Sequence, residues 1–243
     1  MKKALASLAA LIAAAGTALS GCITFGVVIG NGRMVSGEYA YKGVVKRIEI
    51  EKVSATVHIT NKNDDKVTYK IDENLEDSMK IEYNDGVLKI SASGMKSLGV
   101  GANIAFYVGT DALENVNISG DAVIEGIGVF EGRRMGFDIS GAAKINMEID
   151  VDETALSASG AADITLSGRT GSLSIRNSGA ATINARDLKA DSAKLNVSGA
   201  CFVQVSAEET LDVTLSGAGA VTYWGDPAVT RKISGLGTVN QGE

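Results

Sequence analysis

The residues that could perform chemistry in this sequence are few and lie far apart. It contains one histidine, His58, and two cysteines, Cys22 and Cys201. These cannot supply the four nitrogen and sulfur ligands of an ordinary zinc site. Nor does one histidine in a strand-like stretch indicate a catalytic Ser-His-Asp or Cys-His group. We therefore expect no catalytic residue, no metal and no cofactor, and a buried, inert thiol at Cys201.

Acidic residues gather at positions 148–153, where Asp150, Asp152 and Glu153 are expected to lie in a connecting loop. A solvated acidic turn is the simplest interpretation, and a weak calcium site is the alternative because carboxylates bind Ca²⁺. A carbohydrate-active enzyme would need two carboxylates converging about 5–10 Å apart. No such cluster repeats along the sequence, so an enzyme of this class is a secondary hypothesis.

Cys22 belongs to a targeting motif. Residues 1–21 begin with two lysines, continue with an alanine-rich apolar run and end with small residues, as secretory signals do. Leu19-Ser20-Gly21-Cys22 resembles the lipobox of bacterial lipoproteins, which implies cleavage before Cys22 and lipid attachment to its thiol. Ile23 in place of aspartate resembles lipoproteins of the outer membrane. An ordinary secreted protein or an uncleaved anchor are the alternatives.

The net negative charge of the chain limits which partners it can bind. The net charge of −6 falls to −8 when the two lysines of the signal are removed. A basic face for nucleic acid and a polybasic patch for anionic lipid are both missing from the sequence. We expect no nucleic-acid partner, and a membrane partner through the lipid on Cys22.

A repeat dominates the second half of the chain. Ser-Gly pairs recur at intervals of 18 to 21 residues, beginning at Ser119, Ser140, Ser159, Ser178, Ser198, Ser216 and Ser234. A period near 19 residues fits one coil of a solenoid. Within each unit the hydrophobic period is two, as in 137–149, which predicts strands with one buried face.

Stacked in register, the units predict columns of like residues. The glycine of each pair has inward parity, where we expect it to bend the strand around a narrow core and to let neighbouring backbones approach closely. Further along each strand comes an inward column of small residues, and after it an inward column of β-branched residues. The small column is Ala122, Ala143, Ala162, Ala181, Cys201, Gly219 and Gly237. The β-branched column is Ile124, Ile145, Ile164, Ile183, Val203, Val221 and Val239.

These columns predict an all-β fold, a right-handed parallel β-helix with coils of about 19 residues and an irregular N-terminal cap. Roughly ten coils would form a rod on the order of 45–50 Å long. An antiparallel β-sandwich is the alternative. In the cap, Ser54-Ala55 is expected to replace a Ser-Gly pair, and Asn84-Asp85-Gly86 to turn a hairpin. The expected divisions are a signal at 1–21, a lipidated tether and cap at 22–43, and a β-helix at 44–243.

One outward column could bind a ligand. The position six residues after each serine is polar throughout, and its central members are Asn146, Thr165, Asn184, Gln204 and Thr222. A flat row of hydrogen-bonding groups could hold a glycan or an extended envelope protein, although exposed sheet positions are polar in any case. Phe202 and Trp224 are the candidate aromatic platform for a sugar.

The portion from about residue 30 to 240 resembles the bacterial head-GIN family of auto-transporter adhesin domains. The resemblance rests on Gly30-Asn31-Gly32, on residues 71–92, on the repeated Ile-Ser-Gly-x-Ala units and on residues 216–239. It implies a β-helical fold and a cell-envelope location, and it supplies no catalytic residues. We therefore expect a non-enzymatic envelope lipoprotein for adhesion, scaffolding or ligand binding, with a carbohydrate-active enzyme and an envelope sensor or lipid-binding accessory protein as alternatives.

Overall fold

The structure is a computed structural model that describes residues 27–93, 97–98 and 103–243. Cys22 and the expected signal segment therefore lie outside the described residues. Strands account for 75% of the structure and helix for 3%. In the described part of the chain, no helix is long and apolar enough to cross a membrane.

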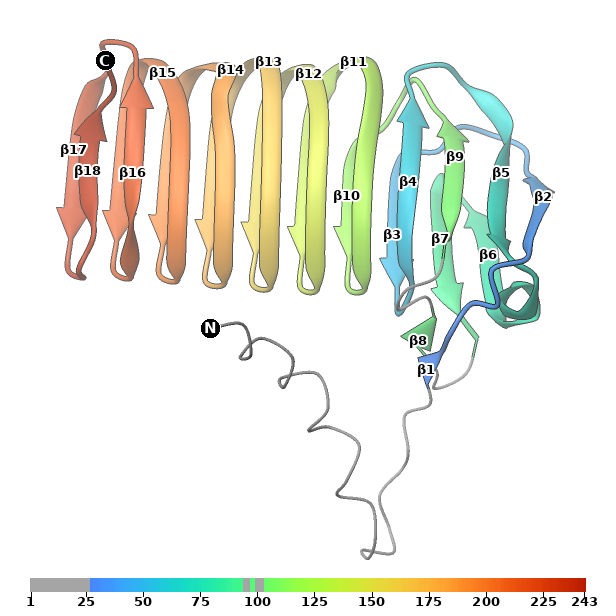
Figure 1. Cartoon of the computed structure of the whole chain (residues 1–243). Coiled ribbons are helices and arrows are strands. Elements are labelled where there is room, and N and C mark those ends of the chain that lie inside the picture. The colour runs from blue at the N-terminus through green and yellow to red at the C-terminus, as the bar shows by residue number, and fades with distance from the viewer. Residues whose placement is uncertain (1–26, 94–96, 99–102) are drawn as a thin grey trace, which may run out of the picture.

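The chain forms a parallel β-solenoid of about seven turns spaced about 19 residues apart, as Figure 1 shows. This confirms the predicted parallel stack and contradicts the β-sandwich, but the stack is shorter than the roughly ten coils expected. The strands of the stack are β10 (Asn115–Ile118), β11 (Asp121–Ile139), β12 (Ala142–Ala158), β13 (Ala161–Asn177), β14 (Ala180–Val197), β15 (Ala200–Leu215), β16 (Ala218–Trp224), β17 (Ala228–Ile233) and β18 (Thr238–Gln241).

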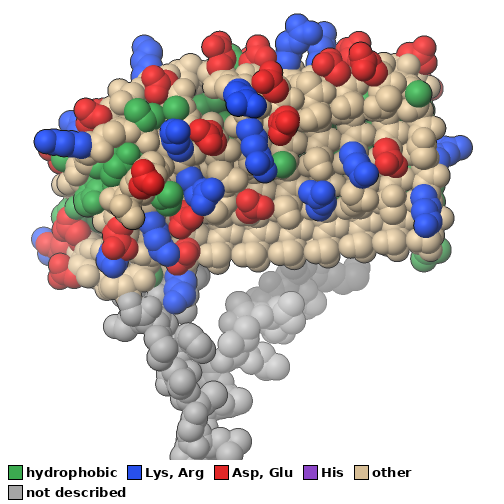
Figure 2. Space-filling view, turned by 180° about the vertical axis from the view of Figure 1, so that it is seen from behind, with side chains coloured by type: hydrophobic (Ala, Val, Ile, Leu, Met, Phe, Trp, Pro, Cys, Tyr) green, Lys and Arg blue, Asp and Glu red, His purple; other side chains and the backbone are tan. Residues whose placement is uncertain are grey.

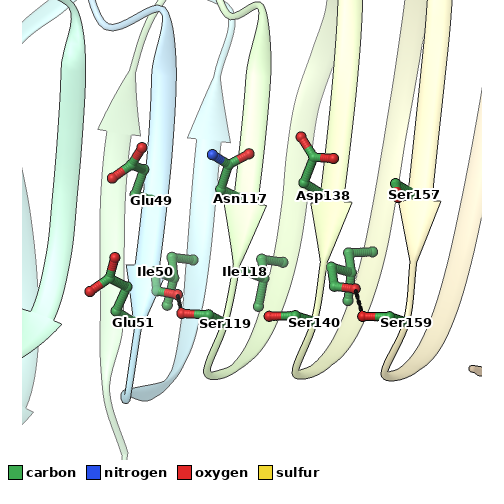
Figure 3. Close-up of a pocket in the computed structure, with 11 residues that line it drawn as sticks. Glu49, Ile50, Glu51, Asn117, Ile118, Ser119, Asp138, Ser140, Ser157 and Ser159 are labelled. Atoms are coloured by element: carbon green, nitrogen blue, oxygen red, sulfur yellow. Dashed lines mark hydrogen bonds between the residues drawn. The ribbon is translucent and has the colours of Figure 1, made fainter.

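Each long strand folds over and contributes to two opposite sheets. Face 1 contains the first half of β11 to β15 with β16 and β18, and face 2 contains the second half with β10 and β17. The strands bend between the faces at one rim, where the pairing of β12 with β13 skips Asp152. The Ser-Gly pairs turn the chain at the opposite rim, here called the Ser-Gly rim (Figures 1 and 3).

The two rims differ in charge. Figure 2 shows acidic and basic side chains along the upper rim and none along the lower rim of the solenoid, where the Ser-Gly turns lie. The upper bends carry exposed residues such as Arg133, Asp152 and Glu209. The predicted acidic loop at 148–153 is wrong, because Asp150 and Asp152 belong to the continuous strand β12. Among the described residues no group of three or more His, Cys, Asp or Glu could hold a metal ion.

The predicted inward columns are confirmed. Ile145 pairs in parallel with Ile124 and Ile164, and every member of the β-branched column is buried. Ala143, Ala162 and their equivalents lie beside them as a second buried column up to Cys201. Stacking of identical side chains along the rod buries apolar surface continuously, which supplies the main stabilisation of the solenoid.

Of the two reasons predicted for the repeated glycine, the close approach of neighbouring backbones is confirmed, and a position lining the core is wrong. The glycine of the Ser-Gly pair is only partly buried, so it does not line the core. A Cβ added at Gly160 would lie 1.8 Å from the carbonyl oxygen of Gly141 in the preceding coil. The same distance, 1.8 Å, separates a Cβ at Gly141 from the oxygen of Gly120. The backbone of the neighbouring coil, not the width of the core, therefore excludes a side chain.

The serine of the pair binds the preceding coil. The Ser159 amide donates to the carbonyl of Ile139 at 2.8 Å, and its hydroxyl approaches the same oxygen at 3.4 Å. Ser198 contacts Asn177 in the same way. The turn thus continues the hydrogen-bond ladder between coils, which leaves fewer backbone groups unsatisfied at the rim.

A cap of antiparallel strands closes the N-terminal end. On face 1, β2 (Met34–Ala40) pairs with β5 (Asp64–Asp72), which pairs with β9 (Ala105–Gly109). On face 2, β6 (Met79–Asn84) pairs with β7 (Val87–Ala92), and Asp85 and Gly86 both have positive φ as the predicted hairpin requires. The 3-10 helix η1 (Glu73–Ser78) buries Leu75 beneath it. These antiparallel elements replace the first predicted coils.

Two further strands join the cap to the solenoid. β3 (Arg47–Glu51) pairs with β10, and β4 (Ser54–Thr60) pairs with β11, both in parallel. The predicted equivalence of Ser54 with the repeat serines is wrong. Ser54 pairs with Asp121, and Lys52-Val53 occupy the turn that faces Gly120. Below the cap, β1 (Val27–Val28) pairs with β8 (Ser97–Leu98) on the side of the Ser-Gly rim (Figure 1).

The C-terminal end has no comparable cap in the described chain. At this end β17 is the last strand of face 2, and β18 is the last strand of face 1. Ile233 pairs with the fully buried Leu215, yet it is 40% exposed. Arg231 has the inward parity of Val213 and donates from Nη1 to the carbonyl of Val239 on the opposite face at 3.3 Å. A charged side chain thus closes the end of the core.

Candidate binding surfaces

The predicted polar column exists as a straight row on face 1. Asn146, Thr165, Asn184, Gln204 and Thr222 pair with one another in parallel register across five consecutive strands. Asn146 and Gln204 are exposed, and the other three are partly exposed. Glu125 and Asn240 extend the row at its two ends. The geometry of the row is therefore as predicted.

Sequence reasoning missed the N-terminal continuation of this row. Glu125 pairs with His58 on β4, and His58 pairs with Tyr107 on β9. The Nδ1 atom of His58 lies 2.9 Å from Oε2 of Glu125, and its ring stacks on Tyr107 with centroids 4.8 Å apart. The alternation in residues 54–60 already places His58 outward, but its partners come from distant strands. His58 therefore belongs to the surface row of polar residues.

The expected aromatic platform does not form. Phe202 is 64% exposed on face 1, but Trp224 lies on the next coil and four positions further along the strand. The Arg186 guanidinium carbon lies 4.4 Å from the centroid of the Trp224 ring. The indole nitrogen of Trp224 also donates to the carbonyl of Glu243 at 3.3 Å. Trp224 is thus engaged within the chain, and Phe202 stands alone.

A long apolar groove, hereafter the alanine groove, runs along face 1 beside the Ser-Gly rim. Its volume is about 840 Å³, and it extends from Asp121 on β11 to Ala218 on β16. Successive coils are about 4.8 Å apart, so five steps give a length of about 24 Å. The side chains along its floor are small and exposed: Ala142, Ala161, Ala180, Ala200 and Ala218. Its only charged lining residues are Asp121, Lys144 and Asp163.

Cys201 contributes to the wall of the alanine groove and remains a buried thiol. It is 1% exposed, and burial raises the pKa of its thiol to about 11. The charged thiolate is disfavoured because the apolar surroundings replace its solvation by water. A reactive cysteine requires a lowered thiol pKa. Cys201 therefore packs in the core and is not a reactive thiol.

A second, polar cavity adjoins the alanine groove at its N-terminal end. It has a volume of about 350 Å³ and lies over β4, β5 and β9. Asp121 and Val123 line both cavities, so the two are neighbours on face 1. Lys70 lines the polar cavity from β5, which β4 and β9 separate from β11. Asp121 accepts a hydrogen bond from the Ser54 hydroxyl at 2.9 Å.

Face 2 carries a smaller polar cleft of about 340 Å³ at the same rim (Figure 3). Two rows of side chains from neighbouring coils line it, and Figure 3 shows both. The upper row is Glu49, Asn117, Asp138 and Ser157, and the lower row is Glu51, Ser119, Ser140 and Ser159. Lys89 Nζ lies 2.8 Å from Glu51 Oε1, and this hydrogen bond raises the pKa of Lys89. Lys89 beside the cleft is therefore already paired.

Comparison with known proteins agrees with this architecture. A family described as "Putative auto-transporter adhesin, head GIN domain" matches residues 47–227. The chain belongs to this family. The match runs from β3 in the cap to β16 of the solenoid, and it confirms the resemblance found in the sequence. No curated protein sequence matches the chain.

Solved structures share the head GIN fold at low sequence identity. A "putative adhesin" from Bacteroides fragilis is 16% identical with a TM-score of 0.78, covering 88% of this chain and 99% of its own. A "putative lipid binding protein" from Parabacteroides distasonis is 22% identical with a TM-score of 0.72, covering 90% and 100%. A "putative adhesin" from Parabacteroides merdae is 19% identical with a TM-score of 0.66, covering 89% and 99%. At these identities the likeness establishes the fold.

Proposed function

We propose that this head GIN protein is a non-enzymatic cell-envelope lipoprotein that presents face 1 of its solenoid for adhesion to a glycan or an envelope protein. The observation that carries the proposal is the polar row, which places hydrogen-bonding side chains at regular spacing on one flat sheet. Such a surface suits an extended, repetitive ligand because equivalent contacts recur at every coil. The adhesin description of the family supports the same function.

The adhesion proposal is tested with two variants of the same strand. Asn184 and Asn196 both lie on β14 and are both partly exposed, but they belong to face 1 and face 2 respectively. Asn184→Glu should weaken binding to glycan arrays and to envelope extracts, because it adds charge within the row. Asn196→Glu adds the same charge outside the polar row, so this variant should bind the same ligands as the wild type does. Equal effects of the two variants would contradict the proposed surface.

The proposed anchor is a lipid on Cys22 in the outer membrane. Val27 at the start of β1 lies five positions after Cys22, a distance of at most about 17 Å for a fully extended chain. The lipid would thus hold the Ser-Gly side of the cap near the membrane. Cys22→Ala should release the protein from the membrane fraction, and retention of the variant there would contradict lipid anchoring.

Lipid binding is a second candidate function. The specific observation that favours it is the alanine groove, which offers a long apolar surface open to solvent. The Parabacteroides distasonis protein described as lipid binding has the same fold. Lipid binding and adhesion use different parts of face 1, so the two functions are compatible.

A further inference from the structure

We propose that a cleft at the charged rim binds an extended basic peptide, which adds a short strand to an unpaired edge of β11. The cleft has a volume of about 560 Å³ and lies at the bends of β11 and β12, on the rim opposite the Ser-Gly rim (Figure 2). Residues 111–114, 131–134 and 152–153 line it. We call it the rim cleft. The proposal uses neither the polar row nor the alanine groove.

The edge of β11 is unpaired where it borders the rim cleft. β4 pairs with β11 as far as Ile127, and β10 resumes the pairing only at Gly136. Between them, no residue of the described chain makes a backbone hydrogen bond to this side of residues 128–135. The one side-chain hydrogen bond there, within the described chain, runs from Asn61 Nδ2 to the carbonyl of Val129 at 3.0 Å. The other backbone groups on this side are free to bond to an added strand.

The unpaired edge exists because one coil is incomplete. After β4 ends at Thr60 the chain forms the cap, and it returns to the solenoid only at Asn115, the first residue of β10. The segment 111–114 crosses the rim in place of a full bend, and the pairing resumes where the Gly136 amide donates to the carbonyl of Glu114 at 2.8 Å. The bends of β12, β13 and β14 each pair with a coil on both sides. The unpaired edge is therefore particular to β11.

The lining of the rim cleft is net negative. Five of its residues are acidic, and two, Arg133 and Arg134, are basic. Arg134 lies opposite Glu153 in the parallel register of β11 and β12, so it offsets that carboxylate. Lys46 lies 3.6 Å from Glu114 and offsets a second one. The remaining carboxylates outnumber the guanidinium of Arg133, so the cleft attracts positively charged groups.

Glu131 is the proposed contact for a basic side chain. It is exposed and has no cation within 4.0 Å in the part of the chain that the structure describes. Its register partner on β12 is Asp150, and like charges directly opposite each other repel. A lysine or arginine side chain beside Glu131 relieves this repulsion through a charge-assisted hydrogen bond. The free edge and the free carboxylate therefore suit the same ligand, a basic strand.

The test measures binding of fluorescently labelled peptides to the full chain by anisotropy at low ionic strength. The probe is a peptide of four Lys-Thr repeats, which places its lysines on one face when extended. It should bind at least about tenfold more tightly than a peptide of four Glu-Thr repeats. The Lys-Thr peptide with every backbone amide N-methylated keeps its charge but cannot donate strand hydrogen bonds, so it should bind at least about tenfold more weakly.

Two pairs of variants locate the site. Nothing lies within 4 Å of a Cβ at Gly132, so Gly132→Trp should fill the rim cleft without disturbing the fold, and weaken binding at least about tenfold. Ser172→Trp is its control, since Ser172 is exposed at the bend of β13 outside the cleft. Glu131→Gln should weaken binding about threefold to tenfold. Glu209→Gln removes the same charge from the same rim on β15 and should bind the peptide as the wild type does.

Each contrary result has a definite meaning. Equal binding of the methylated and unmethylated peptides, or equal losses from Gly132→Trp and Ser172→Trp, would overturn strand addition at β11. Tighter binding of the Glu-Thr peptide would overturn the assignment of a basic partner. Absence of binding by the Lys-Thr peptide would overturn the proposal as a whole.

Discussion

At the residue scale, the distance between neighbouring backbones determines which side chains the repeat accepts. Gly141, Gly160 and their equivalents have ordinary negative φ, so conformational freedom does not explain them. Each instead lies under the carbonyl of the preceding coil's glycine, where no Cβ fits. The small size of the next inward residue has a separate cause, since Ala143 and Ala162 pack into the buried interior beside the turn.

Gly160→Ala should lower the free energy of unfolding by about 1–3 kcal/mol or more, because the new methyl overlaps a backbone oxygen that cannot rotate away. Gly132→Ala is the matched control. Nothing lies within 4 Å of a Cβ at Gly132, and its φ is not positive, so the variant should unfold at nearly the wild-type denaturant concentration. Equal destabilisation of both variants in urea titrations would contradict the close-approach explanation.

Buried acidic protons predict a loss of stability in alkali. Burial raises the pKa of Cys201 from 9.0 to about 11 and that of Tyr41 from 10.0 to about 12. The unfolded chain ionises each group at its ordinary pKa, and the folded chain holds the proton longer. The contribution of these two groups to stability should therefore be constant below pH 9 and decline as pH rises through 9–11 for Cys201 and 10–12 for Tyr41.

The thiol's part of this decline is measured with Cys201→Ala, which places the residue of the preceding coils at this position. The difference in unfolding free energy between wild type and variant should change by about 2–3 kcal/mol between pH 8 and pH 11. A difference that stays constant over this range would show that the Cys201 thiol does not couple to folding.

At the element scale, the two ends of the solenoid are protected in different ways. The N-terminal end is covered by antiparallel strands and η1, and the stacked rings of Tyr41 and Tyr83 lie 4.6 Å apart between them. The C-terminal end presents the edges of β17 and β18, with Leu236 94% exposed at the turn. Exposed edges favour association with other strands, and an inward-pointing charge opposes it. Arg231 has this position.

Arg231→Val should promote end-to-end association, because another chain could then stack on β17 without burying an unpaired charge. Sedimentation velocity should show a larger species whose fraction rises with protein concentration. Lys232→Val is the control, since Lys232 points outward on the same strand and pairs with Thr214. The hypothesis fails if Arg231→Val stays monomeric or if both variants associate equally.

At the scale of the whole molecule, the solenoid is built so that each coil contacts its two neighbours. Ala142 pairs with Ala161 and Ala161 with Ala180, and the same offset of one coil holds through the central strands. Stability is then approximately a sum over coils and their interfaces. The surface features follow the same axis, because the polar row, the alanine groove and the rim that carries charged side chains all run perpendicular to the strands.

Deletion of residues 161–179 should leave a folded protein, because Ala180 then follows Gly160 and the Ser-Gly turn is restored. Circular dichroism should show a β spectrum and a cooperative transition at a somewhat lower temperature. Deletion of 161–170 removes about half a coil and places face 2 residues on face 1, so we expect it to prevent cooperative unfolding. A folded half-coil deletion would contradict the nearest-neighbour description.

The sequence by itself determined the solenoid, because its period of two within units and of about 19 between units can be satisfied together by parallel coils. It therefore predicted the buried columns, the outward polar row from Asn146 to Thr222 and the hairpin at Asp85-Gly86. These features depend on local alternation and on repetition, and both can be read from neighbouring residues.

Only the tertiary structure decided how non-repeating segments meet. The antiparallel cap, the pairing of His58 with Glu125 and Tyr107, and the displacement of Ser54 from the turn arise between strands distant in sequence. The alanine groove is also tertiary, because stacking aligns five alanines that are 18 to 20 residues apart in the sequence. The spacing of the alanines along the chain predicts their column. The depth of the groove beside that column depends on how the backbone folds at the Ser-Gly rim.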